Sequence, residues 1–209
     1  MKKNKISKNW INKQRRDIYV RKSKIDGYRS RAVYKLIEID EKFKIFKNSI
    51  SVVDLGGSPG SCSQYSAKKI KNGNILSIDL KPMEKIENIK QIIGNFLEPK
   101  VQRKILEYFG VQHINKGKVD VVISDMSENT TGNKNLDSIS SGELCKEALI
   151  FASHVLKKNG HFVSKIFMGS SFNEIISTAR FYFKETKVFK PLASRKDSKE
   201  SFIICKNLR

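Results

Sequence analysis

A glycine-rich turn between an apolar segment and a helical segment constrains the fold of this chain more than any other feature. SVVDL (51–55) reads as a strand, GGSPG (56–60) as a turn and SCSQYSAKKIK (61–71) as a helix. Glycine lets the backbone approach a ligand and adopt a positive φ. The start of the helix presents unpaired N–H groups that suit an anionic group. The order therefore predicts an α/β fold with a ligand site at 56–60, although a tight turn without a ligand is the alternative for this segment alone.

Further apolar and amphipathic segments alternate along the rest of the chain. Strands are expected at 74–80, 89–95, 118–125, 160–167, 185–191 and 200–206, and helices at 29–43, 98–110, 141–157 and 171–183, with a polar loop at 126–139. This alternation predicts a mostly parallel sheet with helices on both faces. Only nine residues, 191–199, join the last two strands, which is short for a right-handed crossover. We therefore expect a seven-stranded sheet with an antiparallel last strand.

Positive charge is concentrated at the amino terminus. The chain has 41 Lys and Arg against 21 Asp and Glu, and residues 1–35 hold 13 of these basic residues with only two acids. Such a density repels itself unless a polyanion is near, although a lysine-rich proteome also produces basic chains. We interpret residues 1–28 as a basic RNA-binding arm and 29–209 as a single domain. We expect residues 1–24 to be flexible without RNA.

Cysteine usage and hydropathy exclude several classes of protein. Cys62, Cys145 and Cys205 are widely spaced, and the three histidines do not stand at metal-ligand spacing with them. This excludes a disulfide framework and predicts that no metal is bound. No apolar run approaches the roughly 18 residues of a membrane span, and no apolar stretch follows the basic start as in a secretory signal. A cytoplasmic monomer is expected, while the basic start also fits transit to the mitochondrial matrix.

Polar residues stand where the predicted strands end. Asp79 ends one strand, where an acid accepts hydrogen bonds from a ribose diol or caps a turn. Asn95 ends another, where its amide either reads an adenine edge or caps a turn. Asp125 ends a third, and Lys165 lies inside the apolar strand FVSKIF, where a lysine is costly unless it is paired or used.

The motifs around these residues resemble the FtsJ/RrmJ (RlmE) family of ribosomal RNA ribose 2′-O-methyltransferases over nearly the whole chain, from about 25 to 206. The matching segments are SRAVYKLIEID (30–40), VVDLGGSPGSCSQY (52–65), ILSIDLKPME (75–84), GNF (94–96), VVISDMSENTTG (121–132), GHFVSKIFMG (160–169) and SRKDSKE (194–200). The resemblance implies a Rossmann-like methyltransferase fold and S-adenosyl-L-methionine as cofactor. It also implies that ribosomal RNA within the large subunit is the partner and a uridine 2′-hydroxyl the acceptor.

The resemblance also implies the site residues. The family's Lys-Asp-Lys-Glu tetrad falls on Lys35, Asp125, Lys165 and Glu200. Its cofactor-binding positions fall on Gly56, Pro59, Gly60, Cys62, Asp79, Asn95 and Asp125. Our hypothesis is that Lys165 is the general base, made neutral by burial and neighbouring cations. Asp125 would orient Lys165 and the hydroxyl, while Lys35 and Glu200 fix the geometry and balance the charge.

The chain departs from the family pattern in three places. Ser61 and Cys62 stand where the family has Gly-Trp, and the site survives this change if the backbone N–H of position 62 is what binds. Asn95 stands where the family has an Asp that faces adenine. The amide keeps an oxygen acceptor, but the negative charge of the carboxylate is lost. Glu128 replaces a Pro in the loop after Asp125, so the shape of that loop is expected to differ.

Other functions compete with ribosomal RNA methylation. They are 2′-O-methylation of transfer RNA or of an mRNA cap, a non-catalytic RNA-binding role in ribosome assembly, and methylation of a small molecule. The complete tetrad favours a catalyst over an assembly factor. The basic arm favours RNA over a small molecule.

Overall fold

The computed structural model describes residues 12, 14–111, 118–127, 134–195 and 198–209, with side chains of 134–138 left out. The helices are α2 (Ile18–Ile25), α3 (Val33–Phe43), α4 (Ser61–Lys69), α5 (Pro99–Phe109), α6 (Lys134–Val155) and α7 (Phe172–Tyr182). The strands are β1 (Ser51–Leu55), β2 (Asn74–Asp79), β3 (Ile89–Ile93), β4 (Val119–Ser124), β5 (Leu156–Phe167), β6 (Phe183–Phe189) and β7 (Glu200–Leu208). Among the described residues, no helix is long and apolar enough to cross a membrane.

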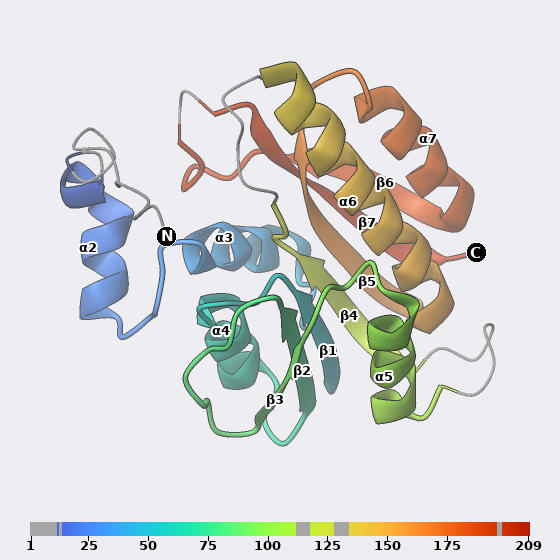
Figure 1. The fold of residues 1–209 in the computed structure, drawn as a ribbon, viewed down its shortest axis with the longest axis horizontal. Helices are drawn as coiled ribbons and strands as arrows, with labels where there is room; N and C mark the ends of the chain where they lie inside the picture. The colour runs from blue at the N-terminus through green and yellow to red at the C-terminus, as the bar shows by residue number, and fades with distance from the viewer. Residues whose placement is uncertain (1–11, 13, 112–117, 128–133, 196–197) are drawn as a thin grey trace, which may run out of the picture.

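The strands form one seven-stranded sheet in the order β3-β2-β1-β4-β5-β7-β6 (Figure 1). Strands β1 to β5 pair in parallel, whereas β7 pairs antiparallel with both β5 and β6. The predicted fold class and the antiparallel last strand are therefore confirmed. The strand order reverses between β1 and β4, and open α/β sheets bind ligands outside the carboxyl ends of the strands at such a point.

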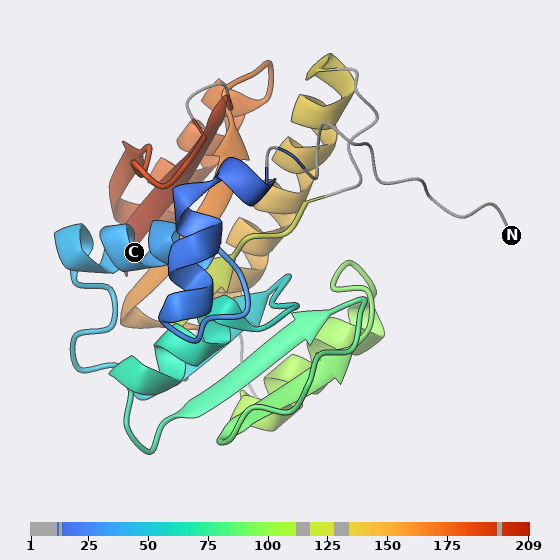
Figure 2. The same cartoon turned by 90° about the vertical axis from the view of Figure 1, so that its left-hand side faces the viewer.

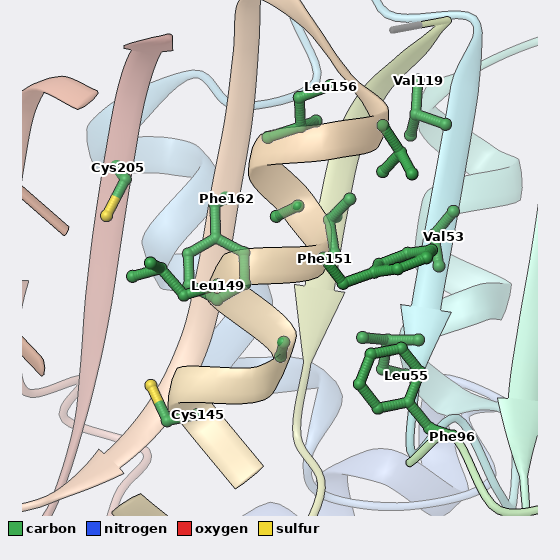
Figure 3. Close-up of a cluster of buried hydrophobic side chains, with 14 of the residues drawn as sticks. Val53, Leu55, Phe96, Val119, Cys145, Leu149, Phe151, Leu156, Phe162 and Cys205 are labelled. Carbon is green, nitrogen blue, oxygen red and sulfur yellow. The ribbon is translucent and has the colours of Figure 1, made fainter. Parts of the chain in front are cut away.

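Two apolar cores cover the two faces of the sheet. Successive residues of β1 belong to different cores. Val52 packs with α3 and α4, whereas Val53 packs with α5 and α6. Figure 3 shows the second of these cores, where Phe151 of α6 lies beside Phe96 with their rings 5.2 Å apart. All five residues of β1 are buried, so its sequence, SVVDL, shows no alternation of apolar and exposed polar residues.

Element boundaries differ from the prediction mainly around α6. Residues 134–139 belong to α6 rather than to the predicted loop, and β5 begins at Leu156 instead of residue 160. The segment KNLDS (134–138) is polar and carries no apolar periodicity, so the pattern gave no signal of a helix there.

The expectation that residues 1–24 are flexible is wrong for the part that the structure describes. Helix α2 is capped by Asp17, whose side chain accepts a hydrogen bond from the N–H of Tyr19 at 3.0 Å. The Tyr19 ring packs on Tyr34 of α3, with 5.4 Å between ring centroids. Figure 2 shows α2 lying next to α3. Packing of tyrosines, which charge patterning does not reveal, therefore fixes this segment; residues 1–11 and 13 lie outside the described part.

Candidate active site

Four ionisable side chains from separate elements meet at the carboxyl edge of the parallel strands. Asp125 follows β4, and Lys165 lies two residues before the end of β5. Glu200 begins β7 and pairs with Phe167, the last residue of β5, because β7 runs antiparallel. Lys35 lies in α3. The predicted convergence of the four residues is therefore confirmed, while their roles stay a prediction.

The four charges alternate in sign along a continuous chain of contacts. The Nζ atom of Lys165 lies 3.1 Å from Oδ1 of Asp125. The Nζ atom of Lys35 lies 4.0 Å from Oδ2 of the same carboxylate and 2.9 Å from Oε1 of Glu200. Lys165 is only 6% exposed. These groups are therefore withdrawn from water, where charge–charge interactions are stronger than at the surface.

Opposite charges control protonation at this site. Burial alone raises the pKa of Asp125, but Lys165 and Lys35 outweigh it and hold that pKa below its ordinary value. Burial alone lowers the pKa of Lys35, but the carboxylates of Asp125 and Glu200 outweigh it, so that pKa lies above its ordinary value. Lys35 is therefore held protonated at neutral pH and is unsuited to act as a base.

One acceptor at the centre of the tetrad is left without a directed hydrogen bond. Lys165 donates to the backbone oxygen of Asp125 at 2.9 Å, and Oδ1 of Asp125, although close to this ammonium, accepts no hydrogen bond from the described residues. This oxygen is buried and faces the Lys165 ammonium at 3.1 Å, so the ion pair satisfies it.

The glycine-rich turn lies at the same edge and requires its glycines. Gly56 and Gly60 have φ of 76° and 111°. A Cβ atom on Gly60 would lie 2.7 Å from Cδ1 of Ile86 and 3.0 Å from Nη1 of Arg29. A Cβ on Gly56 would lie 2.9 Å from the backbone of Met126, next to Asp125. The turn is therefore packed closely against the residues that surround the tetrad.

Helix α4 begins directly after this turn, at Ser61, so Cys62 stands in its first turn. The N–H groups of a first helical turn have no partner within the helix. The N–H of Cys62 can therefore donate a hydrogen bond to a ligand. The Cys62 thiol is buried, and burial raises its pKa well above the ordinary value, so the thiol stays neutral. The structure thus keeps the N–H of Cys62, the group through which the site was expected to tolerate Cys62 in place of the family's Trp.

Asp79 ends β2, whereas Asn95 lies two residues beyond the end of the neighbouring β3 rather than at its end as predicted, and both hold turns. The carboxylate of Asp79 accepts hydrogen bonds from the N–H groups of Ser58 at 3.0 Å and Lys81 at 2.9 Å. A carboxylate has about four acceptor positions, so Asp79 keeps capacity for a diol. Oδ1 of Asn95 accepts from the N–H of Leu97 at 3.0 Å, which is the turn-capping role; the adenine contact stays a prediction.

Sequence reasoning missed Arg29 as a residue of this site. Its guanidinium donates to the backbone oxygens of Pro59 at 3.0 Å, Glu84 at 2.7 Å and Lys85 at 3.2 Å. Arg29 thereby ties the glycine-rich turn to the loop after β2. Nothing in the sequence distinguishes this arginine from the other cations of the basic arm. Glu128 lies outside the described residues.

The chain was compared with known protein families and curated proteins. The FtsJ-like methyltransferase family model matches residues 28–208. The ribosomal RNA large subunit methyltransferase E of Pelagibacter ubique (strain HTCC1062) is 64% identical over 209 residues, which is all of both chains. The protein of the same name from Rickettsia akari (strain Hartford) is 42% identical over 96% of this chain and 88% of its own length.

Solved structures agree with the fold. A Plasmodium falciparum protein assigned to the ribosomal RNA methyltransferases superposes with a TM-score of 0.75 at 30% identity, covering 87% of this chain and 98% of its own. Human methyltransferase-like protein 13, solved with SAH, superposes with a TM-score of 0.58 over 84% of this chain and 79% of its own. At 11% identity the human protein shows a shared fold alone.

Proposed function

The chain belongs to the FtsJ-like methyltransferase family, and we propose that it transfers the methyl group of S-adenosyl-L-methionine to a ribose 2′-hydroxyl of large-subunit ribosomal RNA. The observation that carries this proposal is the largely buried Lys165–Asp125–Lys35–Glu200 chain, whose side chains are at most 20% exposed, beside a glycine-rich turn. A hydroxyl is a weak nucleophile at neutral pH, and this arrangement supplies both an acceptor for its hydrogen bond and a candidate base.

The residues around the turn fit the proposed cofactor. Gly56 and Gly60 lie in a closely packed turn with no room for a side chain. The first turn of α4 presents N–H groups that can bind the carboxylate of the cofactor. Asp79 would accept from the ribose diol, and Asn95 would face the adenine. Pro59 takes part through its backbone oxygen, which Arg29 holds in place. Cys62 would contribute its N–H.

Each tetrad residue has a separate task in the proposed reaction. S-adenosyl-L-methionine supplies a methyl group on a positively charged sulfur, so the acceptor oxygen needs only to be aimed and deprotonated. The Asp125 carboxylate would accept a hydrogen bond from the 2′-hydroxyl and fix its direction. Lys165, in its neutral form, takes the hydroxyl proton on Nζ.

Glu200 balances the second ammonium of the site. Without it, Asp125 would face two lysines and a cationic sulfur alone, and Lys35 would lose the contacts that hold it within 4.0 Å of Asp125. Glu200 therefore acts by keeping Lys35 charged and in place rather than by touching the hydroxyl.

The substrate assignment rests on the relatives and on charge. The bacterial relatives named above are large-subunit ribosomal RNA methyltransferases, and this chain carries a formal net charge of +20, which suits a polyanion. A uridine as target, action within the assembled subunit, a monomeric state and a cytoplasmic location belong to this proposal. The bacterial source of those relatives gives the mitochondrial alternative no support.

A transfer assay with radiolabelled cofactor tests the proposal. Ribosomal RNA, large subunits, transfer RNA and capped mRNA are each offered to the protein, and the products are digested to nucleosides. We expect label in a 2′-O-methylnucleoside from ribosomal RNA or large subunits only. Label confined to transfer RNA or to the cap, or a methyl group on a base, would contradict the proposal.

A further inference from the structure

The carboxylate of Glu200 has a second partner besides Lys35. The hydroxyl of Ser194 donates a hydrogen bond to Oε1 of Glu200 at 2.9 Å. Ser194 lies in the loop between β6 and β7, is 5% exposed, and donates its own N–H to the oxygen of Pro191 at 3.0 Å. A buried hydroxyl in a closed loop therefore fixes the orientation of a tetrad carboxylate.

The same loop is anchored to α3 by another carboxylate. Oε2 of Glu38 accepts from the N–H of Leu192 at 2.6 Å, and Oε1 accepts from the N–H of Ala193 at 2.8 Å. The Arg31 guanidinium donates to the oxygen of Ala193. The backbone directly before Ser194 is thus held at three points, and two of them come from one side chain.

Helix α3 carries both ends of this arrangement. Lys35 and Glu38 are three residues apart, a spacing that places them on one face of a helix. Lys35 contacts Glu200 directly, while Glu38 reaches Glu200 through the loop and Ser194. A shift of the loop relative to α3 would move the Ser194 hydroxyl away from the Glu200 carboxylate, whose backbone stays paired with β5.

We propose that Glu38 and Ser194 are positioning residues of the tetrad: Glu38 fixes residues 192–193 against α3, and Ser194 fixes the Glu200 carboxylate that holds Lys35 beside Asp125. Neither residue touches the reacting groups. The proposal rests on the proposed function and names two residues on which its site depends.

The first test is Ser194→Ala, with Ser194→Thr to restore the hydroxyl. We expect Ser194→Ala to lower the single-turnover rate of methyl transfer roughly tenfold, the low end of what a hydrogen bond to a charged group contributes. The Kd for S-adenosyl-L-methionine should stay at the wild-type value, the Tm should fall by no more than a few degrees, and Ser194→Thr should recover most of the rate. A Ser194→Ala rate within twofold of wild type would overturn the proposal.

A double-mutant cycle separates positioning from general support of the fold. In a Glu200→Ala background the Ser194 hydroxyl has no carboxylate to orient. Ser194→Ala should therefore lower the single-turnover rate by less than a further twofold. An equal tenfold loss in both backgrounds would mean that Ser194 acts by another route.

Glu38→Gln tests whether Glu38 anchors the loop. The new amide places an NH₂ group against the N–H of Leu192 or of Ala193, so one of the two hydrogen bonds is lost. We expect a loss of rate with little change in cofactor affinity. The matched control is Glu41→Gln, an exposed carboxyl on the same helix, which should behave as wild type. Equal rates for the two glutamine variants would remove Glu38 from the proposal.

A crystal structure of Ser194→Ala decides the geometry independently of any activity. The Lys35 ammonium lies 2.9 Å from Oε1 and 3.0 Å from Oε2 of Glu200, and we expect the carboxylate to rotate away from at least one of these two contacts. Unchanged contacts would overturn the positioning role. Failure of the wild-type protein to methylate ribosomal RNA would instead count against the proposed function, and this structure would still test the positioning.

Discussion

The ammonium of Lys165 lies 3.1 Å from Oδ1 of Asp125 and donates a hydrogen bond to the backbone oxygen of the same residue at 2.9 Å. Asp125 therefore holds its neighbour at two points, one on its side chain and one on its backbone. Lys35 is held protonated, and Lys165 is the base of the proposed mechanism.

Lys165→Ala should abolish methyl transfer while leaving cofactor binding nearly intact. A general base contributes roughly 10²–10⁴-fold, so the single-turnover rate should fall by at least that factor. The control is Lys158→Ala, an exposed lysine of the same strand, which should keep the wild-type rate. A Lys165→Ala rate above a tenth of wild type would show that the base lies elsewhere.

Asp79→Ala should weaken cofactor binding by one to two orders of magnitude. The substitution removes a charged acceptor for the ribose diol, and such hydrogen bonds contribute ~1.5–3 kcal/mol. It also releases the N–H groups of Ser58 and Lys81, so loosening of the turn acts in the same direction. Calorimetry that finds an unchanged Kd for S-adenosyl-L-methionine would place the cofactor away from β2.

Arg29→Lys should also weaken cofactor binding, although it keeps the charge. The guanidinium fork serves three backbone oxygens, whereas an ammonium group cannot reach all three with the same geometry. We expect a severalfold rise in Kd with the transfer rate at saturating cofactor largely retained. If Arg29→Lys binds the cofactor as tightly as wild type does, the turn does not depend on this arginine.

Chelation should leave the reaction unchanged. The described residues contain no group of three His, Cys, Asp or Glu side chains that could hold a metal, and the methyl donor is already activated. EDTA should not lower the rate when monovalent salt maintains the RNA fold. Activity that returns only with one particular transition metal would contradict the proposed mechanism.

Removal of residues 2–24 should weaken RNA binding and flatten its salt dependence. Residues 1–24 carry ten Lys and Arg with one acid, and each phosphate neutralised steepens the log–log slope by about 0.7–0.9. The deletion also removes Asp17 and Tyr19, which hold α2 against α3, but Arg29 and the turn remain, so the Kd for S-adenosyl-L-methionine should not change. Titrations at several salt concentrations compare the two chains, and equal slopes would show that the arm does not contact phosphates.

The sheet was predicted from local patterns, whereas the tetrad was assigned from the family resemblance, and local patterns support only two of its residues. Lys165 interrupts an apolar strand and Asp125 ends another, so their proximity follows from parallel strand ends meeting at one edge. Arg29, Glu38 and Ser194 leave no such mark, since each acts on backbone groups or on a side chain distant in sequence. Helix α2 escaped notice because tyrosine packing on α3 fixes it, and charge counting does not detect that.

Mapping of ribose methylation in the source organism tests the central claim most directly. Large-subunit ribosomal RNA is analysed by mass spectrometry from a strain lacking this gene, complemented with the wild-type gene or with Lys165→Ala. We predict that one 2′-O-methylnucleotide is lost on deletion and returns with the wild-type gene alone. Full methylation in the deletion strain, or its return with Lys165→Ala, would contradict the account.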